Sequence, residues 1–150
     1  MAGIELRSAA LSDQDPIPGR YARDGDNVSP PLAWSGVPDA AQELLLLCED
    51  PDAPSGTFVH WLVTGIAPDS TGVPAGETPP GGTEWTNGFG DLGWGGPRPP
   101  AGDPAHRYFF RLYALAGPPS LPERPTADDV HAAVDGRHLA GGALQGIYQR

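Results

Sequence analysis

Three compact apolar blocks, separated by turn-forming residues, constrain the fold of this chain more than any other feature. The blocks are LLLLC at 44–48, FVHWLV at 58–63 and YFFRLYAL at 108–115. Each has the length of a β-strand, and the 21 glycines and 19 prolines of the chain supply the turns around them. Disordered chains lack such aromatic blocks. The sequence therefore predicts an ordered, mainly β protein that forms a single domain over residues 1–150.

The pattern within each segment predicts the individual strands. The run 44–48 has no polar alternation, which indicates a strand covered on both faces. Further strands are expected at 4–11, 57–66, 107–115 and, briefly, 84–86. The connection 67–105 is rich in glycine and proline, and compact domains seldom carry so long a loop without a role. We expect an ordered functional loop that packs down through its aromatic residues, Trp85, Phe89 and Trp94.

The C-terminal part has the pattern of helices. The stretch from Thr126 to Asp129 fits a capping box, and Gly136 is placed to end the helix that follows it. The apolar residues of 139–147 suggest a second helix, which Gly141 and Gly142 weaken. With the strands first and the helices last, the expected class is mainly β with short C-terminal helices.

Charge and cysteine content exclude several classes of partner. The formal net charge is −10, and the nine basic residues are scattered, so neither nucleic acid nor an anionic membrane is expected to bind. Cys48 is the single cysteine, and we expect it to be a small buried apolar residue. Residues 1–15 lack the apolar segment of a signal peptide, and no run is long enough to span a membrane. A cytoplasmic protein without stable membrane insertion is expected.

Four polar side chains at predicted strand ends are candidates for one site: Asp50, His60, His106 and Tyr108. Alternate residues of a strand share a face, so the last two can point the same way. If the strands that carry these residues are neighbours, the four groups converge at one end of the sheet. Taken singly, each histidine and the tyrosine could simply be a core residue, and the aspartate could serve merely to cap a turn. We expect His131 and His138, in the helical tail, to lie at the solvated surface.

An enzyme is an alternative interpretation of the same residues. Asp50, His60 and His106 could hold a metal ion, or an acid–histidine pair could activate water. A serine hydrolase is less well supported, because GxSxG is absent and Ser55 lies in a turn.

Several motifs resemble one protein family. They are DPDAP at 50–54, His60-Trp61 on the next strand, GPRPP at 96–100 and HRYFFRLYAL at 106–115, with support from DNVSPPLAWSGVP at 26–38 and ALQGIYQR at 143–150. Together they resemble the phosphatidylethanolamine-binding protein family, also called the Raf kinase inhibitor protein family, in its short bacterial branch. The resemblance implies an antiparallel β-sandwich with helices near the C-terminus and a small anion-binding pocket at one end.

The resemblance also implies roles for particular residues. Asp50 is the pocket carboxylate, His60, His106 and Tyr108 contribute side chains, and Pro100 forms a wall. Because an anion needs donors in such a pocket, we also expect the backbone N–H groups at Gly95 and Gly96 to face it. Asp52, Pro54 and Phe58 support the pocket, and the Ala53–Pro54 peptide corresponds to a cis bond in the family. Arg98 occupies a variable position of GPxPP.

The function expected from this combination is non-enzymatic binding of a phosphate-like or other small anion, such as a phosphoryl or phosphoethanolamine headgroup. Protonated imidazoles and a hydroxyl are suitable donors to such a ligand. Asp50 would either orient a histidine and raise its pKa, or receive a ligand ammonium group such as that of phosphoethanolamine. No cofactor or metal is expected. The resemblance adds regulation of a kinase or protease as an alternative function, and a homodimer as an expected assembly.

Overall fold

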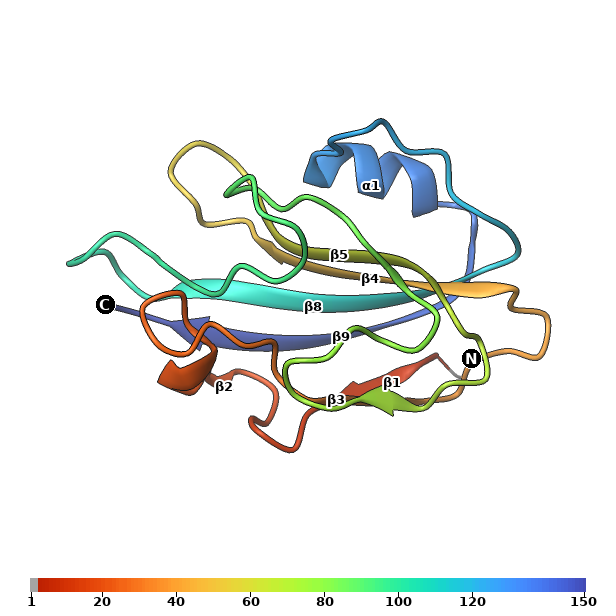
Figure 1. Cartoon of the computed structure of the whole chain (residues 1–150), viewed down its shortest axis with the longest axis horizontal. Coiled ribbons are helices and arrows are strands. Elements are labelled where there is room, and N and C mark those ends of the chain that lie inside the picture. The colour runs from red at the N-terminus through yellow and green to blue at the C-terminus, as the bar shows by residue number, and fades with distance from the viewer. Residues whose placement is uncertain (1–2) are drawn as a thin grey trace.

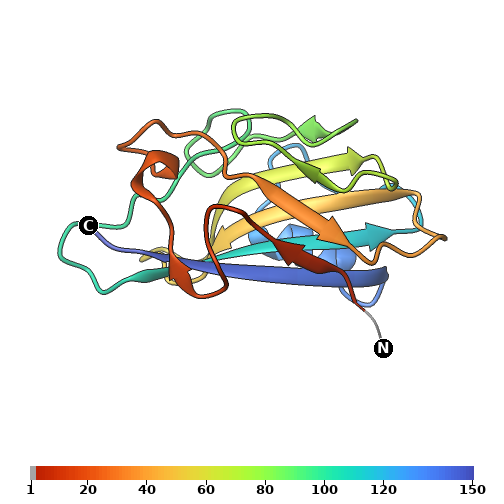
Figure 2. The same cartoon turned by 90° about the horizontal axis from the view of Figure 1, so that it is seen from below.

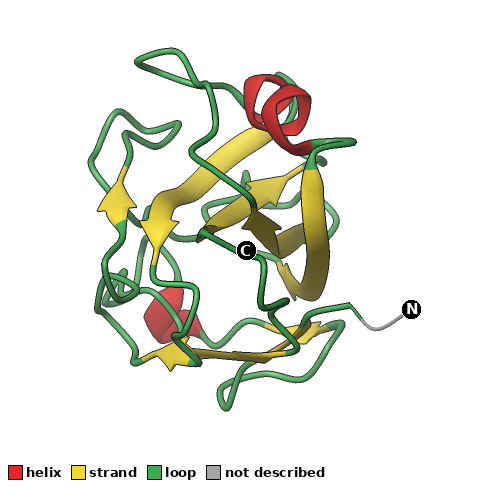
Figure 3. Ribbon diagram, turned by 90° about the vertical axis from the view of Figure 1, so that its right-hand side faces the viewer, coloured by secondary structure: helices red, strands yellow, loops and turns green. Residues whose placement is uncertain are grey.

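A computed structural model describes residues 3–150, which form three layers (Figure 1, Figure 3). A helix covers one face of a six-stranded sheet, and a three-stranded sheet covers the other face. The large sheet has the order β2 (Asp15–Pro16), β9 (His138–Tyr148), β8 (His106–Leu115), β4 (Glu43–Asp50), β5 (Phe58–Ile66) and β7 (Thr83–Glu84). The small sheet has the order β1 (Glu5–Arg7), β3 (Leu32–Ser35) and β6 (Gly72–Val73).

Antiparallel pairing dominates both sheets, and only the short β2 lies parallel to its neighbour β9 in the described chain. Figure 2 shows the small sheet lying across the large one, with β1 (red) beside β9 (blue). The expectation of a mainly β fold built from antiparallel sheets is confirmed. A 3₁₀ turn, η1 (Gly19–Tyr21), lies in the N-terminal segment.

The central strand β4 is buried from both sides, as its uninterrupted apolar run predicts. Leu44 and Leu46 pack between the two sheets with Trp34 and Phe110. Leu45 and Leu47, on the opposite face of the strand, pack under the helix α1 (Ala127–Val134). All four leucines of the run are fully buried. Cys48 is also buried, as expected, and burial raises the pKa of its thiol.

The capping box predicted for α1 is present. The Thr126 hydroxyl accepts a hydrogen bond from the Asp129 backbone N–H, and the Asp129 carboxylate accepts one from the Thr126 backbone. The helix ends at Val134, and Gly136 follows with a φ of +74°. This conformation favours glycine, which explains the stop signal in the sequence.

The second C-terminal helix was a wrong expectation, because 139–147 belongs to the strand β9. This strand pairs with β8 from His106 opposite Tyr148 to Leu115 opposite His138. Its inward-facing positions alternate as in any strand, but two of them are Gly142 and Gly146. A Cβ at the first would lie 2.2 Å from the Ile4 carbonyl oxygen, and one at the second would collide with Ile17. Close approach of the N-terminal segment therefore requires glycine there, and this removed the alternating apolar signal from the sequence.

Candidate functional site

The three strands that carry the predicted site residues are neighbours in the sheet. β4 pairs with β5 on one side, where Asp50 lies opposite Phe58, and with β8 on the other. The end of β4 and the starts of β5 and β8 therefore meet at one end of the large sheet, at the left in Figure 1. The sequence predicted that Asp50, His60, His106 and Tyr108 converge if their strands are neighbours, and the strands are neighbours.

The acidic corner after β4 is held by its own carboxylates. Asp50 Oδ1 accepts a hydrogen bond from the Asp52 backbone N–H at 2.7 Å. Asp52 in turn accepts from the backbone N–H, Nε and Nη2 of Arg107, each at 2.9 Å. The hydrogen bonds from the Arg107 side chain lower the pKa of Asp52. The corner is thus tied to β8, and this contact gives Asp52 a supporting position.

The peptide bond before Pro54 differs from what the resemblance implies. None of the peptide bonds among residues 3–150 is cis, so the Ala53–Pro54 bond is trans. Pro54 nevertheless lines the site, next to Ala53 and Ser55.

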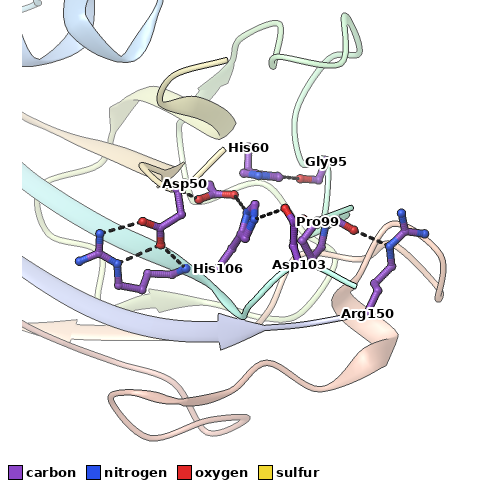
Figure 4. A network of polar contacts seen from close by, with 9 residues as sticks. Asp50, His60, Gly95, Pro99, Asp103, His106 and Arg150 are labelled. Carbon is purple, nitrogen blue, oxygen red and sulfur yellow. Dashed lines mark hydrogen bonds and ion pairs between the residues drawn. The ribbon is translucent and has the colours of Figure 1, made fainter. Parts of the chain in front are cut away.

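His106 lies between two carboxylates, Asp50 and Asp103 (Figure 4). Its Nδ1 is 2.7 Å from Asp50 Oδ2, and its Nε2 is 3.3 Å from Asp103 Oδ2. Burial alone lowers the pKa of His106, but the hydrogen bonds and negative charges of both carboxylates outweigh burial and raise the pKa above 6.5. When it is protonated, the ring donates from both nitrogens, and the two carboxylates balance its charge within the protein.

His60 is in the opposite protonation state. Its Nδ1 is 2.6 Å from the carbonyl oxygen of Gly95 (Figure 4), and the side chain is 3 % exposed. Burial lowers the pKa of His60 to about 4, and this outweighs the hydrogen bond to Gly95 and the charge of Asp50. His60 is therefore neutral at pH 7 and carries its proton on Nδ1, which was not foreseen when both histidines were expected to donate to an anion.

Tyr108 presents a hydroxyl without a partner. The residue is 1 % exposed, and its hydroxyl oxygen makes no hydrogen bond within residues 3–150. Its ring meets the His60 ring edge-on, with centroids 5.1 Å apart. Burial raises the pKa of Tyr108 far above 10, so the hydroxyl keeps its proton and remains a potential donor.

These groups surround a cavity of about 210 Å³, called here the Asp50 cavity. It has the size of a small headgroup, and its walls combine polar groups with aromatic rings and prolines. It is lined by Asp50, Ala53, Pro54, Ser55, Phe58, His60, Phe89, Arg98, Pro99, Pro100, His106 and Tyr108.

The aromatic wall depends on the glycines of the long loop. A Cβ on Gly88 would lie 2.5 Å from the Phe58 ring, and a Cβ on Gly95 would lie 2.5 Å from the Phe89 ring. The two phenylalanine rings contact each other edge-on with centroids 4.7 Å apart. Arg23 stacks on Phe89, with its guanidinium carbon 3.8 Å from the ring centroid. The loop 67–105 is ordered here, and it supplies four of the twelve residues that line the cavity.

Gly96 is the predicted site residue that the structure does not bring to the cavity. Among the described residues, its N–H donates to Asn27 Oδ1 at 2.7 Å, and the N–H of Gly95 donates to the His60 carbonyl at 2.9 Å. Both backbone donors are used inside the protein. The expectation that they would face an anion was therefore wrong.

Sequence reasoning missed several lining residues, above all Phe89 and Arg98. Arg98 stood within GPRPP and could have been included. It is half-exposed, and its nearest carboxylate is Asp24 at 3.7 Å. Phe89 had no motif to mark it, because its place depends on the path of a loop rich in glycine.

His131 does not lie free at the surface as expected. Its Nε2 lies 2.8 and 2.9 Å from the two carboxylate oxygens of Glu49, which is buried beneath α1. Arg111 Nε donates to the same carboxylate at 2.7 Å. His138 lies on β9 and packs edge-on against the Tyr113 ring.

The described residues also bear on metals and membranes. Within residues 3–150 there is no group of three or more His, Cys, Asp or Glu side chains that could hold a metal ion. No helix in this part of the chain is both long and apolar enough to cross a bilayer. The cytoplasmic location stays a prediction.

Comparisons with known proteins agree with the fold and the motifs. A family model described as phosphatidylethanolamine-binding protein matches residues 7–149. The UPF0098 protein of Methanothermobacter thermautotrophicus is 47 % identical over 152 residues, covering 98 % of this chain and 99 % of the relative. LppC of Mycobacterium tuberculosis, whose name describes a lipoprotein, is 46 % identical over 130 residues, covering 87 % of this chain and 63 % of the relative.

Two solved structures have the same fold. The phosphatidylethanolamine-binding protein homologue CT736 of Chlamydia trachomatis superposes with a TM-score of 0.87 and 35 % identity, covering 100 % of this chain and 99 % of that one. YbcL of Escherichia coli, described as a new member of the mammalian family, gives a TM-score of 0.89 and 26 % identity, with 99 % of each chain covered. This chain therefore belongs to the phosphatidylethanolamine-binding protein family.

Proposed function

We propose that this chain is a non-enzymatic binding protein whose Asp50 cavity takes a phosphate-like or other small anionic headgroup, such as a phosphoryl or phosphoethanolamine group. The observation that carries the proposal is the Tyr108 hydroxyl, which is buried in the cavity wall without a hydrogen-bond partner among the described residues. A buried donor left unpaired costs about 1–3 kcal/mol. An anionic oxygen in the cavity would accept that hydrogen bond and remove the cost.

The charges around the cavity support a small anion. Asp50 and Asp103 raise the pKa of His106 and so favour its charged form, and Arg98 lies in the lining with only a long contact to Asp24. Both oxygens of Asp50 already accept hydrogen bonds, from the Asp52 backbone and from His106. The Asp50 charge is therefore compensated, and it repels an incoming anion less than a free carboxylate would.

The same contacts support a binding role over catalysis. A general base needs a free carboxylate or a basic imidazole near pH 7. Asp50 is engaged on both oxygens, and His60, with a pKa of about 4, is a weak base. His106 is more basic, but both of its nitrogens are held by Asp50 and Asp103. Regulation of a kinase or protease and a homodimer stay predictions from the resemblance.

Calorimetric titration with phosphoethanolamine between pH 5.5 and 8.5 tests the proposal. The folded-state pKa of His106 is raised above 6.5, so the ring is a cation below that pKa and loses its charge as pH rises through it. We expect affinity to fall over the same range for the wild type. The ligand ionises too, so the difference between the wild type and His106→Ala isolates the contribution of the protein.

His106→Ala is expected to bind more weakly at low pH and to lose most of the pH dependence. His138→Ala is the matched control, since His138 lies on β9 away from the cavity. Equal affinity of the wild type and His106→Ala at every pH would rule out the site assignment.

A further inference from the structure

We infer that the Asp50 cavity selects ligands that present a hydrogen-bond donor beside their anionic oxygen, because His60 faces the cavity as an acceptor. The inference rests on the proposed function and specifies its ligand class. The donor is either the P–OH of a singly protonated phosphomonoester or the ammonium of a headgroup that reaches His60.

The orientation of His60 fixes which of its nitrogens carries the proton. A carbonyl oxygen can only accept, so the contact of 2.6 Å between Nδ1 and the Gly95 oxygen requires the hydrogen on Nδ1. The N–H of Gly95 donates back to the His60 carbonyl at 2.9 Å. This reciprocal pair holds the ring and the loop together, so the imidazole cannot exchange its two nitrogens without breaking the loop contact.

The other nitrogen, Nε2, is therefore an acceptor as long as the ring is neutral. Within residues 3–150 the ring makes one hydrogen bond of good geometry, from Nδ1 to Gly95, while the Gly96 backbone acts on it more weakly and the residue lines the cavity. The charged groups that act on the ring are Asp50 on β4 and Arg23 in the N-terminal segment, and their effects oppose each other. The remaining neighbours, Phe58, Phe89 and Tyr108, contribute uncharged rings. Burial is thus the largest influence on the pKa of His60, and the ring stays neutral at pH 7.

The cavity combines this acceptor with an uncharged donor. The Tyr108 hydroxyl keeps its proton and has no partner among the described residues. A phosphoryl group that carries one proton matches both, since P–O⁻ accepts from Tyr108 and P–OH donates to His60. The oxygens of a phosphodiester only accept, so a diester without a further donor would set its lone pairs against that of Nε2.

A pair of ligands with equal charge isolates this difference. At pH 5, methyl phosphate is mostly singly charged, as is dimethyl phosphate, and the two differ in P–OH against P–OCH₃. His60, with a pKa of about 4, is still mostly neutral. We expect methyl phosphate to bind at least about tenfold more tightly, in line with the cost of leaving a buried polar group unpaired.

A third ligand, methyl 2-aminoethyl phosphate, tests whether an ammonium can replace P–OH as the donor. It is a diester with an ammonium group. Affinity equal to that of dimethyl phosphate would restrict the donor to P–OH. Affinity equal to that of methyl phosphate in the wild type, lost in His60→Gln, would show that the ammonium also donates to His60, whereas affinity kept in His60→Gln would place the ammonium at Asp50, which also lines the cavity.

The proton position on His60 can also be measured directly on the protein. Two-bond ¹H–¹⁵N correlation spectra of ¹⁵N-histidine protein are expected to show His60 as the neutral Nδ1–H tautomer at pH 7. His60→Gln, whose side-chain amide can either accept or donate, should bind methyl phosphate and dimethyl phosphate with similar affinity. His138→Gln, outside the cavity, should keep the wild-type preference.

The outcomes separate this inference from the proposed function. If none of the three ligands binds the wild type, the proposed function fails, and the inference fails with it. If methyl phosphate and dimethyl phosphate bind the wild type equally, or if His60 is the Nε2–H tautomer, the proposed function stands and the inference is overturned. The spectra and the wild-type comparison hold even if His60→Gln does not fold.

Discussion

Two consecutive carboxylates of β4 lie on opposite faces of the large sheet, and both are 3 % exposed: Glu49 and Asp50. Each pairs with a histidine from a distant part of the chain. Glu49 contacts His131 on α1, and Asp50 contacts His106 at the start of β8. By burial and partner type alone, either pair could be taken for a functional site.

The surroundings of the two pairs differ. On the helix side, Arg111 and His131 both bind the Glu49 carboxylate at 2.7–2.9 Å, and α1 packs over it. On the other side, a cavity of about 210 Å³ lies next to Asp50, with the unpartnered Tyr108 hydroxyl in its wall. A buried acid–histidine pair therefore does not by itself indicate a ligand site. Unsatisfied hydrogen-bonding capacity beside an open volume does.

The largest effect is expected from Glu49→Gln, which breaks the helix-side network. The amide carries no charge and sets its NH₂ group against the donors of Arg111 and His131. Removing one partner of a buried ion pair commonly costs several kcal/mol, and because the side chains of Arg111 and His131 are each 31 % exposed we expect about 2–3 kcal/mol here. Urea denaturation measures this loss, and phosphoethanolamine affinity should not change.

Glu5→Gln is the control, because Glu5 pairs with Arg7 at the surface with 72 % of its side chain exposed. Such pairs contribute about 0–1 kcal/mol. A Glu49→Gln variant of wild-type stability that has lost ligand affinity would reverse the assignment of the two faces.

The intermediate effect is expected on binding alone. Tyr108→Phe removes a hydroxyl that has no partner among the described residues, so the free energy of unfolding should change by less than about 0.5 kcal/mol, or rise. Phosphoethanolamine affinity should fall about tenfold, which is about 1.4 kcal/mol. Calorimetry and urea denaturation on the same protein separate the two quantities.

Tyr113→Phe, on the helix-side face of β8, is the matched control and should bind as the wild type does. A Tyr108→Phe variant with unchanged affinity would remove the hydroxyl from the site.

The contrast between the two faces also shows what a sequence can predict. Asp50, His60 and His106 stand at strand ends in recognisable motifs, so their convergence followed once the strands were placed. The Glu49–His131 pair joins residues 82 positions apart, and His131 gave no local signal beyond its place on a helix. Such a contact depends on how α1 docks on the sheet, which no short pattern encodes.

The errors at the site and in β9 have a related cause. Gly142 and Gly146 are small because other parts of the backbone approach them, and that requirement hides the period of the strand. The proton positions on His60 were missed because they depend on the burial of the ring and on a carbonyl brought near by the loop at Gly95. Residue type predicted the presence of an imidazole, but not whether it donates or accepts.

The smallest effect is expected from Asp103→Asn, which tests how strongly the second carboxylate at His106 affects ligand affinity. Asp103 lies 3.3 Å from His106 Nε2 with 39 % of its side chain exposed. Asp103 contributes less than Asp50 to the raised pKa of His106. It also competes with an anionic ligand for the same ring. At pH 6, where the ring keeps more of its charge than at pH 8.5, the loss of a nearby negative charge should raise phosphoethanolamine affinity about two- to fivefold, as for a partly exposed charge pair. At pH 8.5 the gain should be smaller, because the ring loses its proton at a lower pH when asparagine replaces Asp103. NMR titration of His106 should show the lowered pKa directly.

Asp69→Asn, an exposed position beyond the far end of β5, is the control. It makes the same change in net charge and should alter neither the phosphoethanolamine affinity nor the pKa of His106. An unchanged His106 pKa, or weaker binding at pH 6, would show that Asp103 does not compete for His106.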